Sequence, residues 1–229
     1  MVADGGVPRM ALWPEARPEG LLLVADKRRG ILQGAPVTGP VTPLLETFPS
    51  EGFKGVNDLT VALNGDLYFT DQGQTSLQDP TGRVFRFSKG RLEVLLFDIP
   101  SPNGLVLNLD ETALYVAVAR ANAVWRVPQT PDGGVTKVGL WLQLSGDLAG
   151  PDDLTLDEMG DVIVAHPGTG VWRTDPLLGT ARPSEDRHQY RGEHGRYLRR
   201  PDHRRRRGRV DVRADRRAAR PARAGRRAR

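Results

Sequence analysis

The chain has 229 residues, no cysteine and a formal net charge of +5. The absence of cysteine excludes a disulfide framework and any thiolate metal site. Residues 1–176 hold 14 Lys and Arg against 22 Asp and Glu, whereas residues 177–229 hold 19 Arg, no Lys and 6 acidic residues. The basic character therefore belongs to the C-terminal segment alone, and the first 176 residues resemble an ordinary, mildly acidic globular sequence.

The first ten residues lack the charged and then apolar layout of a signal peptide. The longest apolar stretch near them, Leu21–Ala25, is far shorter than a membrane span. We therefore expect a soluble cytoplasmic protein without a membrane partner, and a periplasmic origin of a longer form stays open. The sequence does not indicate an oligomeric state.

The chain contains repeats of one unit, each with several short β-rich runs separated by Gly, Pro, Asn and Asp. The first copy is degenerate and includes Leu21–Ala25. Three further copies align strand by strand, and equivalent positions are 46 and 49 residues apart, as at Asn57, Asn103 and Asp152. Four antiparallel strands in about 40–50 residues is the size of one blade of a β-propeller.

The predicted fold is therefore all-β, a partial β-propeller of about three and a half blades within residues 1–176. The predicted blades span approximately residues 7–48, 53–97, 100–144 and 148–176, and the last one breaks off after its third strand, near Asp175. The alternative is a β-sandwich with coincidental spacing, which three copies that match strand by strand disfavour.

Three polar residues occupy one repeat position, just before or within the first apolar run of their copy: Asn57, Asn103 and Asp152. The first strand of every propeller blade lines the central channel, so these side chains are expected to converge on one axis. Their oxygen atoms suit Ca²⁺ or Mg²⁺ better than a soft transition metal. The alternative is that these residues only shape the turns that enter the strands.

The motifs in these copies resemble the SMP-30/gluconolactonase/luciferin-regenerating family. The resemblance covers roughly Leu21 to Asp175, and the segments that carry it are Phe53–Val61, Gly65–Gly73, Asp79–Arg86, Ser101–Leu105 and Gly150–Leu154. It implies a six-bladed propeller that hydrolyses lactones with one divalent metal, usually Ca²⁺.

The resemblance also implies roles for individual residues. Asn103 and Asp152 match two metal ligands of the family, and Asp152 matches the residue that transfers the proton. Asn57 matches an Asn that contacts the substrate, or the metal in related phosphotriesterases. The third family ligand, a Glu, has no match in this chain, and Asp153 stands where the family has Gly.

By this resemblance the protein is a metal-dependent hydrolase of sugar lactones or related esters, with one divalent metal, Ca²⁺. The missing Glu and the incomplete ring lead us to expect low solubility and weak or absent activity for the chain as written. The alternatives are a non-catalytic propeller fragment or binding scaffold, and a phosphotriesterase-like hydrolase. His166, the only His of residues 1–176, is expected to lie in a loop or at the surface.

The Arg-rich segment, residues 177–229, shows no strand alternation and is expected to be disordered. An arginine-rich arm for nucleic acid is one interpretation. Arg without Lys, mixed with Ala, Gly and Pro, is more typical of a GC-rich gene read out of frame. We therefore expect a frameshift origin for this segment and regard nucleic acid as an unlikely partner.

Overall fold

The computed structural model describes residues 9–13, 21–35, 39–48, 51–73, 76–175 and 180–183. The chain divides into two compact units, Met1–Arg191 and Gly192–Arg229, and every described residue belongs to the first. Among these residues, no helix has the length and apolar character that crossing a membrane requires.

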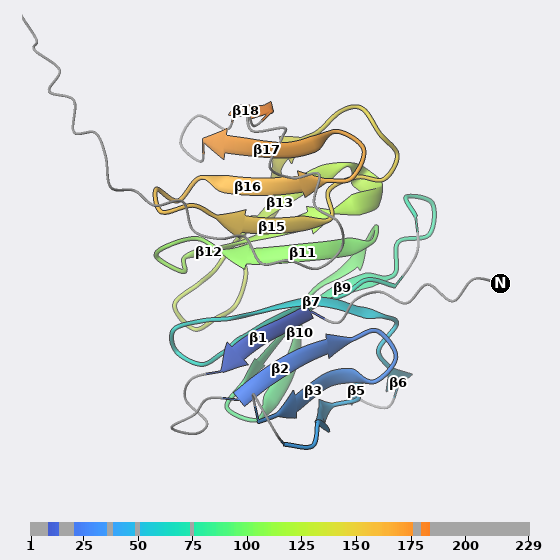
Figure 1. The fold of residues 1–229 in the computed structure, drawn as a ribbon, viewed down its shortest axis with the longest axis vertical. Coiled ribbons are helices and arrows are strands. Elements are labelled where there is room, and N and C mark those ends of the chain that lie inside the picture. The colour runs from blue at the N-terminus through green and yellow to red at the C-terminus, as the bar shows by residue number, and fades with distance from the viewer. Residues whose placement is uncertain are drawn as a thin grey trace, which may run out of the picture. The chain divides into compact units, whose positions relative to one another are not determined.

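The described residues form four four-stranded antiparallel sheets, here called sheets one to four (Figure 1). Sheet one contains β1 (Arg9–Trp13), β2 (Leu21–Asp26), β3 (Gly30–Gly34) and β4 (Thr42–Leu45). Sheet two contains β7 (Val56–Val61), β8 (Leu67–Asp71), β9 (Gly82–Ser88) and β10 (Arg91–Ile99). Sheet three contains β11 (Pro102–Leu107), β12 (Ala113–Val118), β13 (Ala123–Pro128) and β14 (Gly139–Gln143). Sheet four contains β15 (Asp153–Leu156), β16 (Val162–His166), β17 (Gly170–Asp175) and β18 (Thr180–Pro183).

Each sheet is a simple meander, in which every strand pairs with the one that follows it in the chain. A two-stranded ribbon, β5 (Thr47–Phe48) and β6 (Glu51–Gly52), lies between sheets one and two in the sequence, and a short 3-10 helix, η1 (Ala119–Ala121), follows β12. The prediction of an all-β chain made of repeated antiparallel units is thus confirmed.

Sheet four differs from its prediction, because it has a fourth strand where the sequence indicated three. Strand β18 pairs with β17 from Asp175↔Thr180 to Trp172↔Pro183. Residues 180–183 therefore form a strand within the segment that we expected to be disordered. Its sequence, Thr-Ala-Arg-Pro, has no alternation of apolar residues, so only the pairing with β17 reveals it. The rest of residues 177–229 lies outside the described residues.

The hydrophobic core consists of three clusters, each built from two consecutive sheets. The first cluster joins sheets one and two, and contains Leu23, Ile31, Val56, Phe69 and Phe85. The second joins sheets two and three, and the third joins sheets three and four. Sheets that bury apolar faces against both neighbours hold one another in place.

The strands that open consecutive sheets lie next to each other. Strand β7 contacts β1 on one side and β11 on the other, and β11 contacts β15. Residues at the start of these strands are therefore brought to one end of the stacked sheets. At the start of β11, for example, the Gly104 N–H donates to the carbonyl of Asp152, which directly precedes β15.

Two of the opening strands contain a β-bulge at the same repeat position. In sheet two, the register shifts between Val56↔Asp71 and Leu59↔Phe69, so that two residues of β7 lie opposite Thr70. In sheet three, the register shifts between Pro102↔Val118 and Leu105↔Val116. A bulge re-aims side chains and leaves backbone groups unpaired within its own sheet.

The packing of Phe69 provides a test of this core. Phe69 is fully buried and stacks on Phe85, with ring centroids 5.1 Å apart. We expect Phe69→Ala to lower the free energy of unfolding by about 3–5 kcal/mol, since it leaves a cavity between two sheets. Phe97→Ala is the matched control, because Phe97 is 72% exposed and should change stability by less than about 0.5 kcal/mol. Urea unfolding measures both, and equal effects would contradict this core.

Candidate functional site

The three predicted site residues lie at the beginnings of three adjacent opening strands. Asn57 is the second residue of β7, Asn103 is the second residue of β11, and Asp152 directly precedes β15. Both asparagines fall on the bulges, where the side chains leave the regular alternation of a strand.

Asn103 and Asp152 are in direct contact. The Nδ2 group of Asn103 donates a hydrogen bond of 2.7 Å to Oδ1 of Asp152. Backbone hydrogen bonds fix both residues, since the Gly104 N–H donates to the Asp152 carbonyl (2.9 Å) and the Asp152 N–H donates to the Ala165 carbonyl (2.8 Å). Two residues that occupy the same position in successive repeats thus form a hydrogen-bonded pair of side chains in the structure.

The Asn103 side chain carries one unsatisfied atom. The residue is buried, and its Oδ1 has no hydrogen-bond partner among the residues that the structure describes. A buried carbonyl oxygen normally has a partner, and leaving one without costs about 1–3 kcal/mol. An oxygen of this kind beside a carboxylate is suited to accept a hard cation.

Asn57 is held differently from the other two. Its Nδ2 group donates to Oε1 of Gln72, which follows β8 in the same sheet, over 3.3 Å. The structure therefore joins two of the three predicted residues directly and places the third in an amide pair within sheet two. Gln72 was not predicted, although it belongs to the motif Gly65–Gly73.

Gly104 allows sheets three and four to approach at the site. A Cβ atom at this position would lie 2.6 Å from the Asp153 Cα and 2.8 Å from the Leu154 nitrogen. No side chain fits between the two strands there. Asp153 itself is half-buried, and its Oδ1 accepts the Leu154 N–H (2.9 Å).

A buried ion pair lies at the same end of sheet two. Asp71, the last residue of β8, is fully buried, and its Oδ2 receives Nη2 of Arg83 at 2.6 Å and Nε at 3.0 Å. Burial raises the pKa of Asp71, and the charge and hydrogen bonds of Arg83 offset only part of this effect. Since Arg83 also contacts Glu51, this arginine joins β6, β8 and β9.

His166 is not at the surface, contrary to the sequence-based expectation. It ends β16, is 2% exposed, and its Nε2 lies 3.0 Å from Oδ1 of Asn122. Its Nδ1 accepts the Gly168 N–H (3.2 Å), which places the proton of a neutral ring on Nε2. This contact has no signal in the sequence, because Asn122 lies 44 residues away, between η1 and β13.

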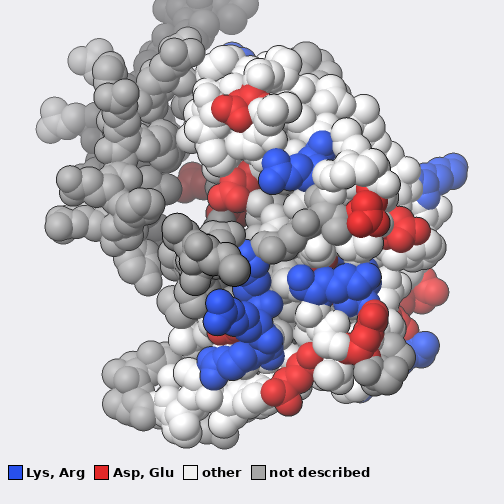
Figure 2. All heavy atoms as spheres, turned by 90° about the vertical axis from the view of Figure 1, so that its right-hand side faces the viewer, with Lys and Arg blue, Asp and Glu red and all other residues white. Residues whose placement is uncertain are grey.

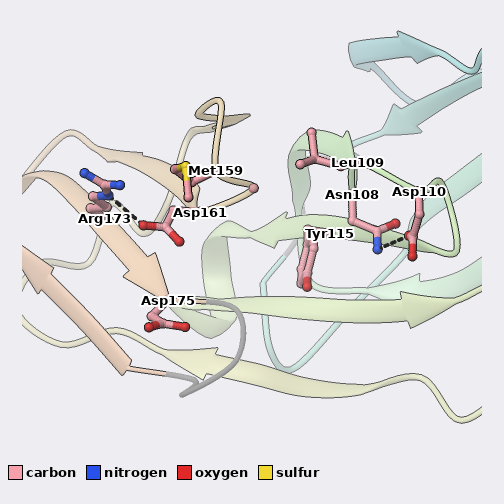
Figure 3. A pocket seen from close by; sticks show the side chains of 9 residues that line it. Asn108, Leu109, Asp110, Tyr115, Met159, Asp161, Arg173 and Asp175 are labelled. Atoms are coloured by element: carbon pink, nitrogen blue, oxygen red, sulfur yellow. Dashed lines mark hydrogen bonds and ion pairs between the residues drawn. The ribbon is translucent and has the colours of Figure 1, made fainter. Parts of the chain in front are cut away.

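A cavity of about 530 Å³ lies at the opposite ends of β11 and β15 from Asn103 and Asp152 (Figure 3). Side chains from sheets three and four face each other across it: Asn108, Leu109, Asp110, Tyr115, Met159, Asp161, Arg173 and Asp175. Arg173 is bound by Asp161 (2.7 Å) and Asp157 (2.6 Å). None of the predicted site residues lines this cavity.

Charged side chains of both signs are scattered among uncharged residues on the face shown in Figure 2. Within the described residues, no three His, Cys, Asp or Glu side chains form a group that could hold a metal by themselves.

A comparison with protein families identifies the class of this protein. Residues 7–182 match the model of the SMP-30/Gluconolactonase/LRE-like region, so the chain belongs to this family. Among curated proteins, a gluconolactonase of Zymomonas mobilis is 32% identical over 169 residues, which are 66% of this chain and 48% of that protein. The chain thus spans about half the length of this relative.

Solved structures show the fold. A gluconolactonase of Xanthomonas campestris superposes with a TM-score of 0.60 at 24% identity, over 68% of this chain and 55% of that one. Regucalcin of Agrobacterium tumefaciens, a calcium-binding protein, also gives 0.60 at 24% identity, over 72% and 55%. Virginiamycin B lyase of Staphylococcus aureus gives 0.56 at 18% identity, over 78% and 55%. The fold is of the β-propeller type, as the repeats predicted.

The close approach at Gly104 can be tested by adding one methyl group. We expect Gly104→Ala to lower the free energy of unfolding by about 1–3 kcal/mol, because the new Cβ forces β15 away from β11. Gly52→Ala is the control, since a Cβ at Gly52 meets nothing within 4 Å. Urea unfolding compares the two variants, and a neutral Gly104→Ala would show that the strands tolerate a wider spacing.

Proposed function

We propose that the protein is a metal-dependent hydrolase of sugar lactones or related esters, and that Asn103 and Asp152 hold its divalent cation. The observation that carries this proposal is the buried Oδ1 of Asn103, which has no partner in the described part of the chain and lies on the side chain that bonds to Asp152. Membership of the SMP-30/gluconolactonase family and the similarity to a gluconolactonase support the substrate class.

The donor set fits Ca²⁺. An amide oxygen and a carboxylate are hard ligands, and Ca²⁺ accepts mixed sets of carboxylate, amide and backbone oxygens. The similarity to regucalcin, a calcium-binding protein, is consistent with this choice. When bound, such a cation polarises a lactone carbonyl as a Lewis acid.

The roles of the protein groups follow from their chemistry. Asp152 is the general base, because its carboxylate can accept a proton from an attacking water molecule and return it to the leaving alkoxide. Asn103 is a neutral ligand that orients Asp152 through their hydrogen bond. Asn57, paired with Gln72, presents an amide at the start of the adjacent strand and is proposed to contact the substrate.

A non-catalytic binding scaffold is the second candidate. The observation that favours it is that the described residues contain no group of three His, Cys, Asp or Glu side chains that could hold a metal, in agreement with the family Glu that has no match in the sequence. The two candidates differ in hydrolysis but not in cation binding, so the hydrolysis assay below separates them.

Cation binding is tested by calorimetry with Ca²⁺ on the full chain. We expect Asp152→Asn to lower the affinity for Ca²⁺ by at least about tenfold, because it removes the charged ligand. Asp110→Asn is the matched control, with the same loss of charge in the turn after β11, and should leave the affinity within about twofold of the parent chain. Equal effects of the two substitutions would contradict a site at Asp152.

Hydrolysis is tested with D-glucono-1,5-lactone in a pH-stat assay with and without Ca²⁺. We expect weak Ca²⁺-dependent hydrolysis by the parent chain and a rate lower by about 100-fold or more in Asp152→Asn, as for the loss of a general base. Ca²⁺ binding without hydrolysis of the lactone favours the scaffold. Hydrolysis of a phosphotriester in place of the lactone would favour the phosphotriesterase-like alternative.

A further inference from the structure

Two buried side chains of sheet two hold the backbone around Asn103 in sheet three. The Thr70 hydroxyl donates to the Asn103 carbonyl over 2.7 Å. The Asp58 carboxylate, through Oδ2, accepts the Leu105 N–H over 3.0 Å. The two are also joined to each other, since the Asp58 N–H donates to Oγ1 of Thr70 (3.1 Å).

Among the described strands, β11 pairs with β12 alone, so these contacts satisfy backbone groups of β11 that face sheet two. The register shift between Pro102 and Leu105 takes the intervening groups out of regular pairing with β12. Thr70 supplies a donor for the Asn103 carbonyl, and Asp58 supplies an acceptor for the Leu105 N–H. Between them, the Gly104 N–H binds the Asp152 carbonyl of sheet four.

The side chains of Thr70 and Asp58 are both shielded from water. Thr70 is fully buried and Asp58 is 7% exposed. A buried carboxylate is costly unless it is used, and here it accepts a backbone N–H two residues from Asn103. Because both side chains are buried, water cannot replace either hydrogen bond unless the interface between sheets two and three rearranges.

We infer that Thr70 and Asp58 are positioning residues for the Asn103–Asp152 pair, which they hold across the seam between sheets two and three. They bind the Asn103 carbonyl and the Leu105 N–H, on either side of Gly104, and thereby fix the direction of the Asn103 side-chain amide. The inference deepens the proposed function, since it assigns the support of the cation site. Substitution of a residue that hydrogen-bonds to a metal ligand typically changes metal affinity by about 10–100-fold.

The test compares two buried threonines with the same chemistry. Thr174 is 1% exposed and its hydroxyl donates to the Val162 carbonyl over 2.9 Å, within sheet four. Thr70→Val and Thr174→Val each remove one buried hydroxyl that donates to a backbone carbonyl. We expect Thr70→Val to lower the affinity of the full chain for Ca²⁺ by about tenfold, and Thr174→Val to leave it within about twofold.

A second pair of variants separates the hydrogen bond of Asp58 from the size of its side chain. Asp58→Asn keeps an oxygen that can accept the Leu105 N–H, whereas Asp58→Ala removes it. We expect Asp58→Ala to lower the affinity for Ca²⁺ by about tenfold and Asp58→Asn to restore most of this loss. Equal Ca²⁺ affinities in the parent, Thr70→Val and Asp58→Ala chains would overturn the inference.

A readout without metal keeps the inference independent of the proposed function. The side-chain NH₂ signal of Asn103 is identified in ¹⁵N spectra of the parent chain by its loss in Asn103→Asp. We expect Thr70→Val to shift this signal and to speed its exchange with water, and Thr174→Val to leave both unchanged. If the parent chain binds no Ca²⁺, the proposed function fails, and the Asn103 NH₂ signal alone then tests the positioning role of Thr70. An Asn103 signal that is the same in Thr70→Val and the parent overturns the positioning role.

Discussion

The short segment Asn103–Leu105 is bonded on both sides by neighbouring sheets, and the geometry of the candidate site depends on these bonds. Sheet two holds the Asn103 carbonyl and the Leu105 N–H, while sheet four receives the Gly104 N–H. Strand β11 lies at the edge of its sheet and, in the described part of the chain, pairs with β12 alone, so part of its backbone groups faces the neighbouring sheets. The bulge places an extra residue at Asn103 and Gly104, and here sheet three bonds to both of its neighbours while the Asn103 side chain bonds to Asp152.

The side-chain oxygen of Asn103, Oδ1, is buried without a hydrogen-bond partner among the described residues, and this lowers the free energy of unfolding. A buried carbonyl without a partner costs about 1–3 kcal/mol, which the surrounding hydrogen bonds and core must offset. The core clusters on both sides of sheet three provide this support, because they bury Leu105, Val116 and Leu154. A site held by the packing of whole sheets keeps its polar atoms in place before any ligand arrives, and such preorganisation lowers the cost of binding.

The sequence predicted the parts of this arrangement that follow from periodicity. Equivalent positions in the repeats indicated an all-β propeller, and they predicted that Asn57, Asn103 and Asp152 converge on one axis. In the structure Asn103 bonds to Asp152, whereas Asn57 bonds to Gln72. The sequence did not reveal the bulges, since a register shift depends on pairing rather than composition. For the same reason it missed Thr70, whose partner is a backbone carbonyl 33 residues away, and β18, whose residues have no strand pattern. His166 was misplaced because its partner Asn122 lies 44 residues away, in the connection between η1 and β13.

The residue that follows each site position explains why two of the three side chains meet. After Asn57 comes Asp58, whose carboxylate reaches across to β11 and therefore occupies the seam between sheets two and three. After Asn103 comes Gly104, which has no side chain, so the backbones of β11 and Asp152 bond directly. The residue opposite each bulge in the partner strand also differs. Thr70 lies opposite the bulge in β7, whereas the smaller Ala117 lies opposite the bulge in β11. The interface between sheets two and three is thus spanned by bonds from side chains to the backbone of β11. The next interface is spanned by the backbone bond of Gly104 together with the 2.7 Å bond between the Asn103 and Asp152 side chains.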